Sequence, residues 1–257
     1  MSKAIVHLDE IKFTWEEMKK IPDDHVAALA VLSYAVSETN ALSKIYLCQS
    51  HDYIGEKAVD SASNIHRFLV IRNWSSKLFE IVEFLRFGGK KPETTDKKLR
   101  KLSTQALLRF EEISNNEGYE VAKAIRHEAT NHYSFEAAKK NLESVHNSAD
   151  CTMYLSKQSG NCFYPLGEEV MFHARLNRRW RNVKTKKEKD DLFNQWLAWN
   201  LAANSWLAET HAKFSDELLF RVTGKNEATP KKYWVSKAFV SRNTERLTPI
   251  FFERPEK

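Results

Sequence analysis

One short polar segment in the middle of the chain, Arg126 to Tyr133, combines side chains that can cleave a phosphodiester. Arg126 carries a fixed cation whose fork of N–H donors matches a phosphate. His132 can accept or donate a proton near neutral pH. RNA brings its own nucleophile, the 2′-hydroxyl, already held beside the phosphorus. An arginine and a histidine therefore form a minimum set for cleaving RNA without a metal ion.

The spacing of these two side chains requires that their helix ends between them. On an ideal α-helix, a separation of six residues turns Arg126 and His132 about 120° apart. Ser134 followed by Phe135 indicates an N-cap and a new helix. We therefore expect the helix that begins at Tyr119 to end near His132, so that the imidazole turns back toward Arg126.

The segment resembles the R-[N/D/H]-x4-H motif of HEPN (higher eukaryote and prokaryote nucleotide-binding) proteins. Arg126 is followed by the polar His127, four further residues and then His132. The resemblance implies an all-helical fold and metal-independent ribonuclease activity, as in toxin–antitoxin, CRISPR and phage-defence systems. It also implies that Arg126 and His132 are catalytic, that His127 supports them, and that two motif copies meet in a homodimer. Tyr133, directly after His132, is a candidate substrate contact.

Two other interpretations of the segment remain open. In a purely structural one, His132 near the carbonyl end of a helix is stabilised by the helix dipole, and Arg126 pairs with a neighbouring acid. In a functional one, the chain is a non-catalytic HEPN-like helical module that binds RNA, a nucleotide or a protein partner. Binding of RNA without cleavage would distinguish this module from the enzyme.

A basic segment from His173 to Lys189 is the second candidate for RNA contact. It holds eight lysines and arginines but one acidic residue, Glu188, and Trp180 offers a ring on which a base can stack. The predicted substrate-binding side chains in this segment are Arg175, Arg178, Arg179 and Arg181. A solvated junction between a helix and a loop is the alternative explanation, and His173 itself is interpreted as a structural residue.

The helix expected from about Glu56 to Phe87 carries a stripe of polar side chains. These are Asp60, Asn64, Arg67 and Arg72. Such a stripe lines the cleft in some members of the HEPN family, and an exposed helix face explains it equally well. A second stripe, of tryptophans, lies on the long final helix and favours core or dimer packing; it consists of Trp196, Trp199 and Trp206.

Other catalytic signatures are absent from the sequence. It has no Gly-rich phosphate loop, no HExxH, no GxSxG and no Asp/Glu cluster at metal-binding spacing. The 3 cysteines form no CxxC pair and have no histidine at ligand spacing. The sequence therefore predicts no cofactor and no metal. Its formal charge of +6 is compatible with a polyanionic partner but does not require one.

The helical periodicity and the small number of turn residues, 7 Gly and 6 Pro, predict an all-α bundle. We expect one domain over residues 1–257, with a motif-bearing core at about 24–146. A basic and Trp-rich helical extension is expected at about 166–257. Between these parts, residues 152–164 are expected to form a small β-hairpin.

The sequence also predicts a cytoplasmic location. The first residues form a mixed polar segment, and the longest apolar run, Val26 to Leu32, is too short to span a bilayer. The expected partners are RNA, a second copy of the chain and an antitoxin or other regulatory protein, with no membrane. The predicted function is a metal-independent endoribonuclease that acts as a toxin or phage-defence effector.

Overall fold

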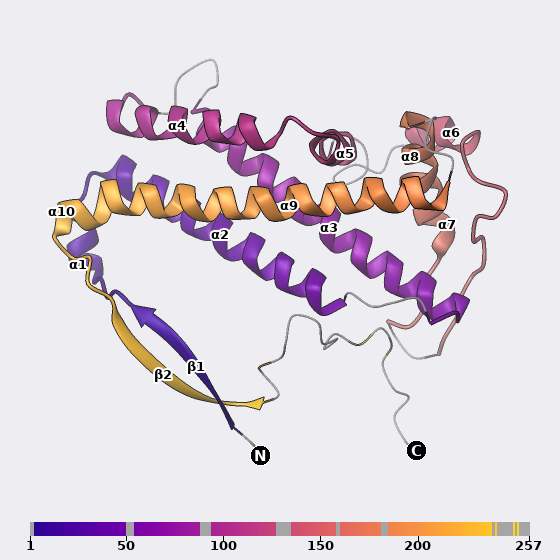
Figure 1. Cartoon of the computed structure of the whole chain (residues 1–257), viewed down its shortest axis with the longest axis horizontal. Helices are drawn as coiled ribbons and strands as arrows, with labels where there is room; N and C mark the ends of the chain where they lie inside the picture. Colours follow the sequence, from indigo (N-terminus) through magenta and orange to yellow (C-terminus); the bar gives the residue numbers. More distant parts are fainter. Residues whose placement is uncertain are drawn as a thin grey trace. The chain divides into compact units, whose positions relative to one another are not determined.

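The computed structural model describes residues 3–49, 54–87, 94–126, 135–157, 160–180 and 185–237, with residues 240, 249 and 251. Helices account for most of these residues, and their one sheet has two short strands (Figure 1). The predicted all-α class is therefore confirmed.

The series of elements begins and ends with a strand, and helices lie between the two strands along the chain. In order, the elements are β1 (Lys3–Glu10), α1 (Trp15–Met18), α2 (Asp23–Gln49), α3 (Lys57–Leu85), α4 (Lys97–Ile113), α5 (Glu117–Ile125), α6 (Phe135–Leu142), α7 (Pro165–Glu168), the π-helical η2 (Glu169–His173), α8 (Ala174–Arg179), α9 (Lys186–Ser215), the π-helical η3 (Asp216–Phe220), α10 (Arg221–Thr223) and β2 (Thr229–Ser236).

Several predicted features agree with these elements. The helix expected at about 56–87 is α3, and α6 begins at Phe135, directly after the predicted N-cap. Within 152–164, the predicted antiparallel pairing is present as a bridge between Tyr154 and Phe163. The rings of these two residues stack with their centroids 4.4 Å apart.

The chain forms two compact units. Unit 1 comprises Met1–Ala41, Lys77–Ile113 and Ala202–Glu245, and unit 2 comprises Leu42–Ser76, Ser114–Leu201 and Arg246–Lys257. The prediction of one domain over the whole chain stays a prediction.

In unit 1, α4 packs against the C-terminal half of α9. The indole N–H of Trp206 donates to the Ala106 carbonyl at 2.8 Å, and the Trp206 ring lies 4.8 Å from that of Phe110. Trp206 is 3% exposed, and in unit 2 Trp196 and Trp199 are 0% and 2% exposed. The tryptophan stripe of α9 is therefore buried in the core. Core packing was one of the two roles predicted for it, and dimer packing was the other.

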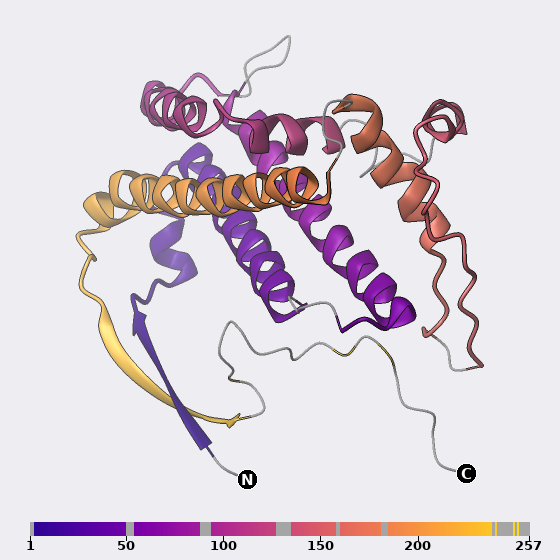
Figure 2. The same cartoon turned by 45° about the vertical axis from the view of Figure 1, so that its right-hand side comes forward.

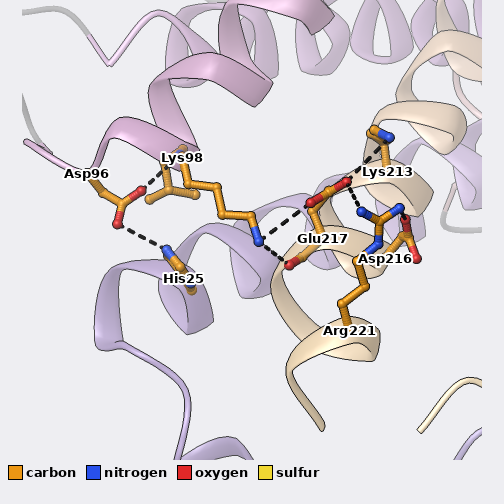
Figure 3. A network of polar contacts seen from close by, with 8 residues as sticks. His25, Asp96, Lys98, Lys213, Asp216, Glu217 and Arg221 are labelled. Atoms are coloured by element: carbon orange, nitrogen blue, oxygen red, sulfur yellow. Dashed lines mark hydrogen bonds and ion pairs between the residues drawn. The ribbon is translucent and has the colours of Figure 1, made fainter. Parts of the chain in front are cut away.

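A polar network joins the start of α4 to its neighbours in unit 1 (Figure 3). Asp96 receives the Leu99 N–H at 2.8 Å and lies 3.1 Å from His25 Nε2, and these contacts hold the pKa of Asp96 below its ordinary value. The Lys98 ammonium donates to the Glu217 carbonyl at 2.6 Å. The Glu217 carboxylate in turn pairs with Arg221 at 2.8 Å. Residues near the starts of α2, α4 and η3 are thus linked through polar and charged side chains.

The two strands of unit 1 form an antiparallel ribbon that extends away from the helices of that unit (Figures 1 and 2). Its register pairs Lys3 with Ser236 and Glu10 with Thr229. Neither segment was predicted as a strand. Two aromatic side chains of β2 lie on the surface: Tyr233 is 40% exposed and Trp234 66% exposed. Each strand forms an edge of this sheet, and edge strands tolerate a proline such as Pro230 and polar side chains on both faces. Without a regular apolar alternation, the sequence pattern did not indicate a strand.

Among the described helices, α2 has the length and composition to cross a membrane, with a mean hydropathy of 1.2 over its most apolar window. Core helices of soluble proteins pass the same test. Polar side chains of α2 are engaged within unit 1: Ser33 lies 2.9 Å from His211 Nε2, Glu38 pairs with Lys77, and Asn40 accepts from Asn204. Of that window, 28% is buried within the described structure. A cytoplasmic location stays a prediction.

In unit 2, a buried hydrogen-bond chain joins α3 to α9. The Trp196 indole N–H donates to Ser75 Oγ at 2.9 Å, and that hydroxyl lies 2.9 Å from both the Ile71 carbonyl and Asn200 Oδ1. Each polar side-chain atom in this hydrogen-bond network has a partner. This matters because a buried polar group without a hydrogen bond lowers the stability of the fold.

Helix α5, which directly precedes the motif arginine, lies very close to α9 in unit 2. The Asn116 side chain caps α5 by accepting the Tyr119 N–H at 3.0 Å. A Cβ at the buried Gly118 would collide with the backbone carbonyl of Gln195, and it would also reach the Trp199 side chain. Glycine at position 118 therefore sets how closely the two helices approach.

Gly118→Ala should destabilise the protein by about 2–3 kcal/mol, because the added methyl group forces α5 away from the α9 backbone. Urea denaturation monitored by tryptophan fluorescence measures the change. Gly167→Ala is the matched control, since nothing lies within 4 Å of a Cβ there. Its stability should stay within about 1 kcal/mol of the parent, with a gain favoured by helix propensity. Equal stabilities for the two variants would contradict the close approach.

Candidate functional site

The motif arginine lies at the end of α5. Arg126 is the residue after Ile125, it is half-buried, and its backbone N–H bonds to the Ala122 carbonyl. His127, His132 and Tyr133 fall within residues 127–134, outside the described residues. The convergence of Arg126 with His132 therefore stays a prediction.

The predicted substrate-binding arginines of the basic segment occupy different surroundings. Arg175 is 4% exposed and donates to the Ala124 carbonyl at 2.5 Å, so it joins α8 to the last turn of α5. Arg178 is half-buried. Arg179 is exposed, lies 3.6 Å from the Glu120 carboxylate and sits 5.4 Å from the centre of the Trp180 ring. Arg181 lies outside the described residues.

Beside these elements, a pocket of about 770 Å³ opens in unit 2. Its walls come from α3, α5, residues 146–149, the stretch from η2 to Trp180, and the first turns of α9. Val121 of α5 lines it, one turn before the motif arginine. This volume falls in the range of sites that hold a small organic ligand.

The polar stripe of α3 divides between structural and pocket-lining roles. Asp60 accepts the backbone N–H groups of Ile54 and Gly55 at 3.2 and 3.1 Å. Arg72 forms a two-pronged ion pair with Glu168, at 2.5 and 2.8 Å. Asn64 and Arg67 line the pocket. The stripe therefore serves both the fold and the pocket rather than lying on an exposed face.

Arg67 has few partners for its charge. One of its terminal nitrogens lies 3.3 Å from the Tyr46 hydroxyl, and its Nε is buried with no hydrogen-bond partner. The guanidinium carbon lies 5.8 Å from the centre of the Tyr46 ring and 5.6 Å from that of Phe193. Ring faces attract a cation but do not neutralise it.

Two histidines also line the pocket. Burial lowers the pKa of His173, despite the opposing effect of the nearby Glu169 and Glu168 carboxylates, so its imidazole is neutral at neutral pH. His146 Nδ1 lies 2.6 Å from Ser148 Oγ. Neither histidine was predicted as a site residue: His146 belongs to no recognisable motif, and His173 was interpreted as structural.

The wall that carries His146 is anchored by the buried carboxylate of Asp150. This carboxylate accepts the Ser61 hydroxyl at 3.0 Å and the Thr152 N–H at 3.1 Å, and it lies 3.1 Å from the Lys57 ammonium. Burial alone would raise the pKa of Asp150, but these contacts outweigh it and hold the pKa well below its ordinary value. Asp150 is therefore ionised and ties the segment to the first turns of α3.

The charges of the pocket balance. Arg67 and Lys189 face Glu169 and Asp190 among its lining residues. In the described part of the chain, no group of three or more His, Cys, Asp or Glu side chains is arranged to hold a metal ion. The arrangement is suited to an organic ligand of low net charge with a planar, apolar part.

Comparison with models of protein families, with curated proteins and with solved structures finds no match to this chain.

Asp150→Asn should lower the free energy of unfolding at pH 7 by about 2 kcal/mol, because a buried, hydrogen-bonded carboxylate is lost. A depressed folded-state pKa stabilises the fold above the unfolded value of 3.8, and this contribution is lost as the pH falls through the folded pKa. The difference between the parent and the variant should therefore shrink below about pH 4.

Urea titrations from pH 7 to pH 3 measure this difference. The exposed Asp191 supplies the control, and Asp191→Asn should stay within about 0.5 kcal/mol of the parent at each pH. A pH-independent deficit in Asp150→Asn would contradict the role of the ionised carboxylate.

Proposed function

We propose that this protein is a metal-independent endoribonuclease of HEPN type. The observation that supports the proposal is the position of the motif arginine: Arg126 directly follows α5, and α5 also contributes Val121 to a pocket of nucleotide size. The basic helix α8 supports it, because Arg175 joins α8 to the same end of α5. Arg178 and Arg179 on α8 add positive charge of the kind that attracts a phosphate backbone.

The proposed reaction is attack by the 2′-oxygen on the adjacent phosphorus. The new bond joins the 2′-oxygen to phosphorus, and the bond from phosphorus to the 5′-oxygen breaks. Arg126 holds the phosphate and stabilises its growing negative charge. His132 either accepts the proton of the 2′-hydroxyl or donates a proton to the leaving 5′-oxygen, and water takes up or supplies the other proton. His127 orients these groups. The products are a 2′,3′-cyclic phosphate and a 5′-hydroxyl.

The assembly proposed for this reaction is a homodimer that brings two motif copies to one cleft. A two-fold axis achieves this with a single surface used twice. Regulation by an antitoxin or another partner, and a role in toxicity or phage defence, belong to the same proposal.

Light scattering coupled to size-exclusion chromatography should give a mass near twice 29.9 kDa. A monomer at micromolar concentration would remove the shared cleft from the proposal.

Arg126→Ala and His132→Ala should each reduce RNA cleavage by at least about 100-fold, because each removes a group that acts in the transition state. The assay follows a labelled RNA on a denaturing gel, with EDTA present, and identifies the cyclic phosphate by mass spectrometry. Circular dichroism should show both variants folded.

The exposed residues Arg86 and His7 supply matched controls, and Arg86→Ala and His7→Ala should cleave like the parent. Cleavage that survives in both motif variants would reject the assigned roles. Cleavage abolished by EDTA would reject the metal-independent mechanism. RNA binding with no cleavage by the parent would favour the non-catalytic module.

A further inference from the structure

The pocket in unit 2 contains a cation with an unusual environment. Within the described residues, Arg67 forms no ion pair with a carboxylate, and its buried Nε has no hydrogen-bond acceptor. A buried donor without an acceptor lowers stability, so such a group is uncommon in a folded protein. Because the charge of Arg67 has no carboxylate partner among these residues, an oxyanion of a ligand at its terminal nitrogens would supply one.

Two neighbouring arginines have the oxygen acceptors that Arg67 Nε lacks. Arg72, on the same helix, binds Glu168 through both prongs of its guanidinium. Arg175, from α8, is satisfied by the Ala124 carbonyl. Arg67 has instead the Tyr46 hydroxyl and the faces of two rings. Its fork of donors therefore remains suited to a planar or tetrahedral oxyanion.

The rest of the pocket indicates what carries that oxyanion. A volume of about 770 Å³ is far larger than a phosphate requires. Phe68, Phe193 and Trp180 line the same pocket and give it apolar, π-rich surface. Aromatic side chains of this kind stack bases of single-stranded RNA. Asn194 adds an amide group that can hydrogen-bond to a base edge.

The acidic side chains of the pocket limit the charge of the ligand. The negative charges of Glu169 and Asp190 offset the positive charges of Arg67 and Lys189. The lining therefore has no excess of positive charge with which to neutralise a triphosphate. A phosphodiester carries one negative charge. The pocket therefore fits one phosphodiester with its base better than a polyphosphate.

We propose that this pocket is a subsite for one unpaired nucleotide of the RNA substrate, with the phosphate on Arg67 and the base against the aromatic walls. The inference rests on the proposed ribonuclease function and adds a residue, Arg67, that lies on α3 and outside the motif. Arg67 acts in substrate binding, and the chemical step is left to the motif.

The test measures RNA binding in the His132→Ala background, where cleavage does not interfere. The probe is a fluorescein-labelled hexaribonucleotide of mixed sequence, and its anisotropy gives the dissociation constant. Arg67→Gln should weaken binding about 10- to 100-fold, the effect of losing a charge-assisted hydrogen bond. Arg67→Lys keeps the charge without the fork and should give an intermediate loss. Arg86→Gln, a loss of charge at an exposed site outside the pocket, should bind like the parent.

The salt dependence separates phosphate contact from a structural effect. Removing one phosphate contact should reduce the slope of log affinity against log salt by about 0.7. Arg67→Gln should also unfold at the same urea concentration as its background or at a higher one, because it removes an unmet buried donor. Unchanged affinity and slope in Arg67→Gln would overturn the subsite, and so would lost affinity that merely tracks lost stability.

Two competitors distinguish the sources of a nucleotide. The dinucleotide adenylyl-(3′→5′)-adenosine, which has one phosphodiester and no terminal phosphate, should displace the labelled RNA, and this displacement should weaken in Arg67→Gln. ATP should compete less well, since its charge meets Glu169 and Asp190. Tighter binding of ATP than of RNA would overturn the assignment to a phosphodiester.

The outcomes for this inference and for the ribonuclease are separable. Arg67-dependent binding by a parent that does not cleave RNA would retain the subsite and remove the enzyme. Cleavage that depends on the motif, with no effect of Arg67→Gln on RNA binding, would retain the enzyme and remove the subsite.

Discussion

The hydrogen bond from the buried Arg175 guanidinium to the Ala124 carbonyl fixes the end of the motif helix. The last carbonyls of a helix lack partners within the helix, and a cation there is also favoured by the helix dipole. Ala124 stands two residues before Arg126, so this bond helps to set where the motif arginine leaves α5. Gly118 holds the other end of α5 against α9. The direction of the motif arginine therefore depends on packing at both ends of a nine-residue helix.

The arginines of unit 2 show how one side-chain type can serve opposite purposes. Arg72 and Arg175 are satisfied internally, by a carboxylate and by a carbonyl, and they stabilise helix packing. Arg67 has only a hydroxyl and ring faces. The guanidinium groups of Arg72 and Arg175 thus stabilise the packing of helices, whereas that of Arg67 keeps N–H donors that a ligand can use. The difference comes from which oxygen atoms neighbouring elements place within reach.

Local patterns in the sequence predicted the features that depend on local physics. The helical class, the start of α6 at Phe135 and the burial of the tryptophan stripe follow from periodicity and capping. The density of positive charge marked α8 but could not show that Arg175 is buried, because burial depends on where α5 lies. The α3 stripe indicated Arg67, whereas His146 enters the pocket from a segment with no motif. The motif histidines lie outside the described residues, so their geometry is still a prediction.

The pairing of β1 with β2 affects the order in which the chain folds during synthesis. Glu10 and Tyr233, which contact each other across the ribbon, are 223 positions apart in the sequence. Closing so long a loop is entropically unfavourable and kinetically slow, so contacts near in sequence form first. During synthesis β1 leaves the ribosome long before β2 and has no strand to pair with until β2 has been made. Unit 1 thus gains its sheet only after β2 has been made, and a chain cut short before β2 keeps β1 as an unpaired strand.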